Sequence, residues 1–424
     1  MKVYKFGGGV IQNSESIRKL AQLIQAEKPG SLVVVVSALG KTTQALEEIL
    51  QCQVAGQPYA PQLQKLYEFH RHMIDQLLDG LREVAYQMLN AWQDTLLAVM
   101  RLPITDVSSD KTYSRIVAEG ELLASRLIAY YLQEQQVACT WLDARDYVKT
   151  NWGFCHAQVD WATTQRLIQN DFLPLLGQKQ VVLTQGFIGS NEKGETTTLG
   201  KEGSDFTGAI LAAALGAESL TIWKDVPGVM NADPKLFEEA TKFSELSYQA
   251  MEEMAFYGAK VVHPKTIQPL AAHHIPLYVR PFHDPHERGT VVMNGFAQVE
   301  HPIYVLQENQ VLVQLSLDDL TFFSEACMQE VVHQLEQQDL RANLMEREAF
   351  KLTMCLNNDH YQTKGLAAAL GQRFRINAQP QVNLLTVLHG DERLGQAWLA
   401  QKEVLLAHQR PDIYQAVFQP DAKA

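Results

Sequence analysis

Long hydrophobic runs are absent from this sequence of 424 residues. No apolar run approaches the ~20 residues that a membrane-spanning helix needs. The first nine residues, MKVYKFGGG, contain no apolar segment of the kind that a secretory signal peptide carries. We therefore expect no membrane partner and no signal peptide.

Cysteine is scarce as well, with 5 residues at wide spacing and no C-x-x-C motif. An odd number without such motifs does not suit a disulfide framework or a structural zinc site. The pairs His273-His274 and His283/His286 also lack the spacing and the partners of metal ligands. We expect reduced thiols, a cytoplasmic location and no dedicated protein metal site.

Positive charge is in short supply, because 36 Lys and Arg residues face 48 Asp and Glu residues, for a net charge of −12. This balance argues against nucleic acid or an anionic membrane as the main partner, although it allows a local basic pocket for phosphate. The 46% hydrophobic and 20% charged residues are typical of a globular protein with a large core. The length suggests two or three domains.

Alternating strand and helix patterns organise roughly the first 280 residues. Residues 2–6 predict a short strand that ends at three glycines, and a helical pattern follows. Residues 31–37, SLVVVVS, predict a strand that is buried on both faces. Further strands are predicted at residues 137–142, 181–187, 219–223 and 276–280. Residues 43–115 are predicted to be a mostly helical excursion from the sheet, and a separate helix is predicted from Glu119. Strand, glycine loop, helix and strand in this order predict an α/β fold with a mostly parallel sheet.

The composition changes after about Phe296, where glutamine becomes frequent and glycine loops become rare. Strands are predicted at residues 311–317, 351–356, 381–388 and 403–407, with helices near residues 328–335 and 397. This order suggests two small α+β units of βαββαβ type.

The segment TLGKEGSDFTGA, from Thr198 to Ala209, combines glycines and small polar residues with a strong helix former behind it. A glycine-rich turn that leads into a helix leaves free backbone N–H groups and the positive end of the helix dipole, which together bind anions. Lys201 adds a positive charge, and Asp205 adds a carboxylate to the first turn. An ordinary capped helix, with Ser204 or Asp205 as N-cap, is the structural alternative.

Other candidate groups follow predicted strands, where α/β sheets bind their ligands. Lys5 precedes the three glycines, and residues 37–43 follow the buried strand. The triplet Gly40-Lys41-Thr42 is not a P-loop, because the required earlier glycine is Val35. A polar loop over residues 225–235 follows another strand. Taken singly, each of these groups also fits a solvated surface residue or loop.

Together these segments resemble the aspartate kinases of the amino-acid-kinase family. The matching blocks are KFGG from Lys5, VSA from Val36 with Thr43 six positions after the serine, GE at Gly120, a G-R-G-G-S-D-like segment at Gly200–Asp205, a D-V-x-G-V-x-x-A-D-P-[RK]-like loop within Trp223–Lys235, and GAKVVHP from Gly258. Any one block is weak, but six blocks in register over residues 1 to about 297 are specific.

The resemblance implies an amino-acid-kinase catalytic domain over residues 1–297, in which helices sandwich a mostly parallel sheet. It also implies a regulatory and dimerisation region of two divergent ACT-like units over residues 298–424. The implied reaction converts ATP and L-aspartate into ADP and 4-phospho-L-aspartate, the first step toward lysine, threonine and methionine. The implied cofactors are ATP and Mg²⁺, with Mg²⁺ held mainly by the nucleotide phosphates, and the implied assembly is a homodimer.

The resemblance also assigns roles by position. Lys5 would hold the transferring phosphoryl group, and Asp205 would organise the catalytic lysines. The substrate-binding residues would be Ser37, Thr43, Glu121, Lys201, Gly203 and Ser204, with Glu121 near the amino group. The ATP-binding residues would be Lys5, Gly7, Gly8, Lys224, Asp225, Met230, Lys235, Lys260 and Val261.

Some residues depart from the family pattern. Gly9 and Val10 replace two hydroxyl residues, and Lys201 and Glu202 replace an arginine and a glycine. Two other functions therefore stay open, a related amino-acid kinase with a different acyl acceptor and a catalytically inactive amino-acid sensor. The family's glycine before the regulatory helix is missing from residues 318–327, so no effector is predicted, and a dimerisation platform alone is the alternative.

Overall fold

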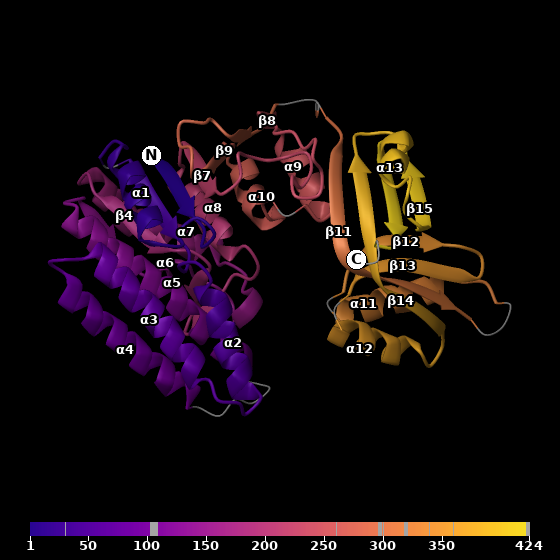
Figure 1. Ribbon diagram of the computed structural model, residues 1–424, viewed down its shortest axis with the longest axis horizontal. Coiled ribbons are helices and arrows are strands. Elements are labelled where there is room, and N and C mark those ends of the chain that lie inside the picture. Colours follow the sequence, from indigo (N-terminus) through magenta and orange to yellow (C-terminus); the bar gives the residue numbers. More distant parts are fainter. Residues whose placement is uncertain are drawn as a thin grey trace. The chain divides into compact units, whose positions relative to one another are not determined.

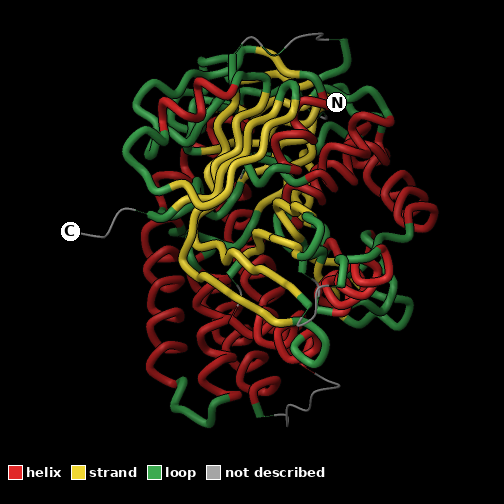
Figure 2. Tube along the Cα trace, turned by 90° about the vertical axis from the view of Figure 1, so that its right-hand side faces the viewer, coloured by secondary structure: helices red, strands yellow, loops and turns green. Residues whose placement is uncertain are grey.

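The computed structural model describes residues 1–29, 31–101, 109–259, 261–295, 299, 301–317, 321–338, 340–358 and 360–420 (Figures 1 and 2). The chain divides into two compact units. The first consists of Met1–Val229, Lys242–Glu252 and Val261–Phe296, and the second of Met230–Thr241, Glu253–Lys260 and Ala297–Ala424. No described helix has the length and apolar character needed to cross a membrane.

An eight-stranded sheet forms the centre of the first unit, with strand order β3-β4-β2-β1-β7-β9-β10-β8. Its strands are β1 (Lys2–Phe6), β2 (Leu32–Val36), β3 (Cys139–Trp141), β4 (Val181–Gln185), β7 (Ser219–Lys224), β8 (Glu245–Leu246), β9 (Leu277–Pro281) and β10 (Thr290–Val292). Every neighbouring pair is parallel except β9 and β10. All five residues of β2 are buried, as the apolar run predicts. The α/β prediction is therefore confirmed.

The helices in this part of the chain are α1 (Ser14–Gln25), α2 (Thr42–Val54), α3 (Ala60–Leu77), α4 (Arg82–Met100), α5 (Ser109–Glu134), α6 (Ala144–Tyr147), α7 (Trp161–Gly177), α8 (Gly203–Leu215), α9 (Tyr248–Phe256) and α10 (Pro264–Ala272) (Figure 1). Helices α3 and α4 pack on α2 and α5, and α9 begins in the first unit and ends in the second. The predicted helical excursion corresponds to α2, α3, α4 and the start of α5, and residues 102–108 of it lie outside the described residues. The described part of the unit also contains a short hairpin of β5 (Ile188–Ser190) and β6 (Thr196–Thr198) and a 3-10 turn, η2 (Phe154–His156).

The prediction of a separate helix from Glu119 is wrong, because α5 runs without interruption for 26 residues from Ser109. Gly120 lies inside this helix. A Cβ atom at Gly120 would lie 3.1 Å from both the Ala38 Cβ and the Thr42 Cγ2 atoms. The glycine therefore lets α5 pack closely against the start of α2, and it marks a contact between helices rather than the start of one.

The second unit contains a six-stranded antiparallel sheet with strand order β12-β13-β11-β14-β16-β15. Its elements are β11 (Ile303–Ser316), α11 (Glu325–Gln337), β12 (Ala342–Arg347), β13 (Lys351–Asn357), α12 (His360–Leu370), β14 (Arg375–Leu388), α13 (Glu392–Trp398), β15 (Val404–Arg410) and β16 (Ile413–Phe418). The predicted α+β, ACT-like architecture is confirmed.

The two α+β halves share their central strands, which the sequence did not predict. Strands β11 and β14 are each 14 residues long and pair over most of that length. Residues Gln310–Ser316 of β11 also pair with β13, whereas Asn383–Leu388 of β14 pair with β16. Each long strand therefore has one end in the half that contains β12 and β13 and the other end in the half that contains β15 and β16.

Candidate active site

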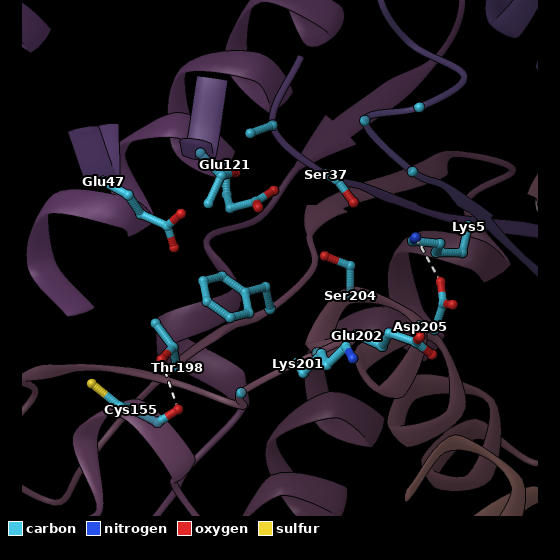
Figure 3. Close-up of a pocket in the computed structure, with 18 of the residues that line it drawn as sticks. Lys5, Ser37, Glu47, Glu121, Cys155, Thr198, Lys201, Glu202, Ser204 and Asp205 are labelled. Atoms are coloured by element: carbon cyan, nitrogen blue, oxygen red, sulfur yellow. Dashed lines mark hydrogen bonds and ion pairs between the residues drawn. The ribbon is translucent and has the colours of Figure 1, made fainter. Parts of the chain in front are cut away.

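A cavity of about 1010 Å³ opens in the first unit where β1, β2 and β7 end (Figure 3). The sheet register aligns Phe6 with Val36 on one side and with Trp223 on the other, so the loops that follow these strands start side by side. Helices α5 and α8 supply further walls. The cavity lining includes twelve of the residues predicted for the site: Lys5, Gly7, Gly8, Ser37, Thr43, Glu121, Lys201, Gly203, Ser204, Asp205, Lys224 and Asp225.

Two lysines meet one buried carboxylate in this cavity. The Lys5 Nζ atom lies 2.6 Å from Asp205 Oδ1, and the Lys224 Nζ atom lies 3.8 Å from Asp205 Oδ2. Burial of Asp205 opposes its ionisation, but the charges of Lys5 and Lys224 outweigh burial and lower its pKa. Asp205 is therefore ionised at neutral pH and holds both ammonium groups on one side of the cavity.

The glycine loop after β1 packs against the loop after β2. A Cβ atom at Gly8 would lie 2.8 Å from the carbonyl oxygens of both Ala38 and Gly40. The Ser37 amide donates a hydrogen bond to the Phe6 carbonyl oxygen at 3.0 Å. A side chain at Gly8 would separate the two loops, so glycine is what allows their backbones to line one cavity.

Glu121 approaches the cavity from α5 and is only 3% exposed. Burial raises its pKa to about 8, against the opposing effects of the Lys5 charge and of a hydrogen bond from the Ala38 backbone. Its Oε2 atom has no hydrogen-bond partner among the described residues. A cationic group entering the cavity would supply that partner and favour the ionised form.

We expect the Glu121→Gln substitution to remove a pH dependence of stability. The pKa of Glu121 rises from 4.5 to about 8 on folding, so between these pH values the folded chain holds a proton that the unfolded chain has lost. The free energy of unfolding therefore falls as pH rises through this window and levels off above pH 8. Urea midpoints of the ligand-free protein from pH 4 to 9 should fall less steeply for Glu121→Gln.

The matched control is Glu83→Gln, which removes an exposed carboxylate from the first turn of α4. Its pH profile should follow that of the unaltered chain. Identical profiles for Glu121→Gln and the unaltered chain would show that Glu121 does not hold a proton in the folded state.

The structure also brings to the cavity side chains that the sequence reasoning missed. Glu47, four positions after Thr43 on α2, accepts a hydrogen bond from the Tyr113 hydroxyl at 2.7 Å. Cys155 and His156, from η2, also line the cavity. The helical spacing from Thr43 to Glu47 was a usable signal, but η2 follows no strand end and carries no recognisable motif.

The start of α8 differs from the capped helix that was the structural alternative for this segment. The N-cap is Glu202 and not Ser204 or Asp205, and no side chain caps the first turn. The Glu202 backbone has φ 56° and ψ 22°, in the left-handed region. Lys201, which precedes it, is exposed at the cavity wall.

Four residues predicted to border ATP are not among the residues that line the cavity. Met230 and Lys235 belong to the second unit, and Lys260 lies outside the described residues. Val261 accepts a hydrogen bond from the Lys224 ammonium through its backbone carbonyl oxygen. Their roles, like those of the residues in the cavity, stay predictions.

Comparison with known proteins identifies the family. Residues 1–281 match the amino acid kinase family. The lysine-sensitive aspartokinase 3 of Escherichia coli is 30% identical over 416 residues, which cover 95% of this chain and 89% of that protein. This chain belongs to the aspartokinases of the amino acid kinase family. The resemblance inferred from the sequence blocks is therefore confirmed.

Other aspartokinases match over different shares of their length. The aspartokinase of Chlamydia trachomatis is 31% identical over 316 residues, which cover 73% of this chain and 69% of that protein. The bifunctional aspartokinase/homoserine dehydrogenase 2 of Arabidopsis thaliana is 32% identical over 295 residues, or 68% of this chain. That alignment spans only 32% of the plant protein.

Solved structures of E. coli aspartokinase III resemble this aspartokinase along nearly its whole length. The complex with aspartate and ADP, in the R-state, has a TM-score of 0.84 at 26% identity and covers 99% of this chain and 96% of the other. The complex with lysine and aspartate, in the T-state, has a TM-score of 0.77 at 25% identity and covers 98% and 95%.

Proposed function

We propose that this chain is an aspartate kinase, which transfers the γ-phosphoryl group of ATP to the side-chain carboxylate of L-aspartate. The products are ADP and 4-phospho-L-aspartate. The observation that carries this proposal is the buried group of Lys5, Asp205 and Lys224 beside the glycine loop, in a member of the aspartokinase family. The product would lead toward lysine, threonine and methionine.

The chemistry needs charge control more than acid–base catalysis. A carboxylate oxygen of aspartate attacks the γ-phosphorus atom, and the bond to the oxygen that bridges the β- and γ-phosphorus atoms breaks, with its electron pair leaving on ADP. The attacking carboxylate is already ionised, so no general base is required. Positioning of the reactants and neutralisation of phosphoryl charge can supply the catalysis.

The proposal gives roles to residues of the cavity and to four residues, Met230, Lys235, Lys260 and Val261, that the family resemblance adds. Lys5 holds the transferring phosphoryl group, and Asp205 fixes the positions of Lys5 and Lys224. Backbone N–H groups at the start of α8 stabilise negative charge. Aspartate would be bound by Ser37, Thr43, Glu121, Lys201, Gly203 and Ser204, and the nucleotide by Gly7, Gly8, Lys224, Asp225, Met230, Lys235, Lys260 and Val261.

Mg²⁺ fits this cavity as a partner of the nucleotide. Within the described residues, no group of three or more histidine, cysteine, aspartate or glutamate side chains is placed to hold a metal ion. The cavity does offer a buried carboxylate oxygen, Glu202 Oε2, that has no hydrogen-bond partner among the residues the structure describes. A protein that binds Mg²⁺ through one or two carboxylates and the substrate phosphates needs no more. The bound Mg²⁺ would offset the negative charge of the phosphates.

The Lys201-Glu202 pair, which departs from the family pattern, bears on which carboxylate accepts the phosphoryl group. Lysine acts as a point charge where arginine grips a carboxylate with two parallel bonds. The loss of one charge-assisted bond costs about 1.5–3 kcal/mol, or roughly ten- to a hundredfold in affinity. A related amino-acid kinase with another acyl acceptor is therefore the second candidate.

A coupled assay of ADP release from Mg-ATP separates these functions. Release that depends on L-aspartate is the expected result. A panel of acidic and amidated amino acids tests other acceptors. If ADP release requires one of these instead of aspartate, that amino acid is the acceptor. Amino-acid binding without any ATP turnover would instead favour a catalytically inactive sensor.

Two further measurements test the proposed regulation and assembly. Lysine or threonine added to the assay would show whether either amino acid inhibits the enzyme, and size-exclusion chromatography with light scattering would test the proposed homodimer.

A further inference from the structure

Glu202 has an unfavourable backbone for a residue with a side chain. Its φ of 56° lies in the left-handed region, which favours glycine. The family motif that this segment resembles has glycine at this position. A strained backbone persists when the surrounding structure imposes it, and such residues concentrate at functional sites.

One oxygen of the Glu202 carboxylate is unpaired at the cavity wall. Glu202 lines the cavity, and its Oε2 atom is buried and has no hydrogen-bond partner in the part of the chain that the structure describes. His263, the N-cap of α10, lies within its electrostatic influence. Burial lowers the pKa of His263 more than Glu202 raises it, so His263 is neutral at pH 7 and does not pair with Glu202 as a cation.

The nearby lysines do not neutralise Glu202 either. Lys5 and Lys224 both pair with Asp205, three positions further along the chain. Within the described part of the chain, no ammonium or guanidinium group lies within ion-pair distance of Glu202. A polyphosphate bound beside Lys5 would therefore approach a free carboxylate, and the two like charges would repel unless a cation lay between them.

We propose that Glu202 is a direct protein ligand for the divalent cation that accompanies the nucleotide phosphates. This inference rests on the proposed kinase function and adds to it a ligand specific to this chain. Carboxylate oxygen is the donor that Mg²⁺ prefers, and Mg²⁺ sites in kinases combine one or two carboxylates with substrate phosphates. Glu202 thereby turns a repulsive contact with the nucleotide into one bridged by the metal ion.

The test measures ADP affinity by titration calorimetry, once with EDTA and once with saturating Mg²⁺. Two substitutions remove the charge: Glu202→Gln keeps the shape, and Glu202→Gly suits the left-handed backbone, so it should fold at least as well. In both, we expect the factor by which Mg²⁺ tightens ADP binding to fall about tenfold, in the range found when metal-site residues are lost. Affinity without metal should stay equal or increase, because a repulsive charge is gone.

The control is Glu83→Gln, which should leave both affinities unchanged. An unaltered Mg²⁺ effect in Glu202→Gln and Glu202→Gly would overturn the inference. So would a loss of L-aspartate affinity, titrated in the same way, together with an unaltered Mg²⁺ effect, because it would instead make Glu202 a partner of the substrate ammonium. The titration of the unaltered chain separates a failure of this inference from a failure of the kinase proposal. If the unaltered chain binds no ADP, both the kinase proposal and the Mg²⁺-ligand inference are overturned.

Discussion

Lys5→Met should lower aspartate-dependent ADP release by roughly 10²–10³-fold, the loss typical of removing one group that stabilises transition-state charge. The Lys5 ammonium is held 2.6 Å from Asp205, within the glycine loop region where the phosphoryl group would lie. Lys224 stays 3.8 Å from Asp205, so it does not replace Lys5 at that point. The effect should appear in kcat, because the charge develops during transfer.

Stability has to be separated from catalysis in this variant. Removing one partner of a buried ion pair costs about 3–5 kcal/mol, since Asp205 loses its nearest countercharge. The double variant Lys5→Met/Asp205→Asn should recover much of that stability but none of the activity. Lys2→Met, on the same strand, removes only a partly exposed pair with Glu27 and should keep full activity. Aspartate-dependent turnover retained by Lys5→Met would refute the role given to Lys5.

Gly186→Ala should reduce both stability and activity through a contact that the sequence does not reveal. Gly186 follows β4, and a Cβ atom there would lie 2.4 Å from the Ser204 Cβ atom and 2.7 Å from its Cα atom. The backbone of α8 would have to move to accommodate the methyl group. Such overpacking costs typically about 1–3 kcal/mol. A shift of about 1 Å in the helix start that carries Ser204 and Asp205 would cost on the order of 10²-fold in rate.

Gly177→Ala is the matched control for this substitution. Gly177 ends α7, and an added Cβ atom would meet nothing within 4 Å. We expect unchanged activity and equal or slightly higher stability, because alanine favours the helix. Denaturant midpoints and kcat/KM measured for both variants decide the outcome. Equal behaviour of the two variants would mean that α8 does not depend on close contact with Gly186.

The central strands and the main site residues were predictable for a physical reason. Strand β2 is apolar throughout because helices cover both faces of the sheet, so its pattern survives in a single sequence. Lys5 is the last residue but one of β1, Asp225 directly follows β7, and neighbouring parallel strands bring such ends to one edge of the sheet. The short strands β8 and β10 were missed because two or three residues carry too little pattern.

Contacts made by distant segments could not be predicted from the sequence. Nothing around Gly186 indicates that it touches Ser204, and nothing around Glu47 indicates the hydrogen bond with Tyr113. The left-handed conformation of Glu202 was also hidden, because a glutamate before a glycine predicts no positive φ. In each case tertiary packing, rather than local preference, decides the geometry.

The shared strands β11 and β14 make the two α+β halves of the second unit inseparable. A domain boundary normally falls where few hydrogen bonds cross, but here the main-chain ladder continues from one half into the other. Separating the halves would cut both 14-residue strands and leave each fragment with an edge strand whose backbone N–H and C=O groups are unpaired. The two halves therefore fold and unfold as one unit, and we expect neither half to be removed or replaced without disrupting the other.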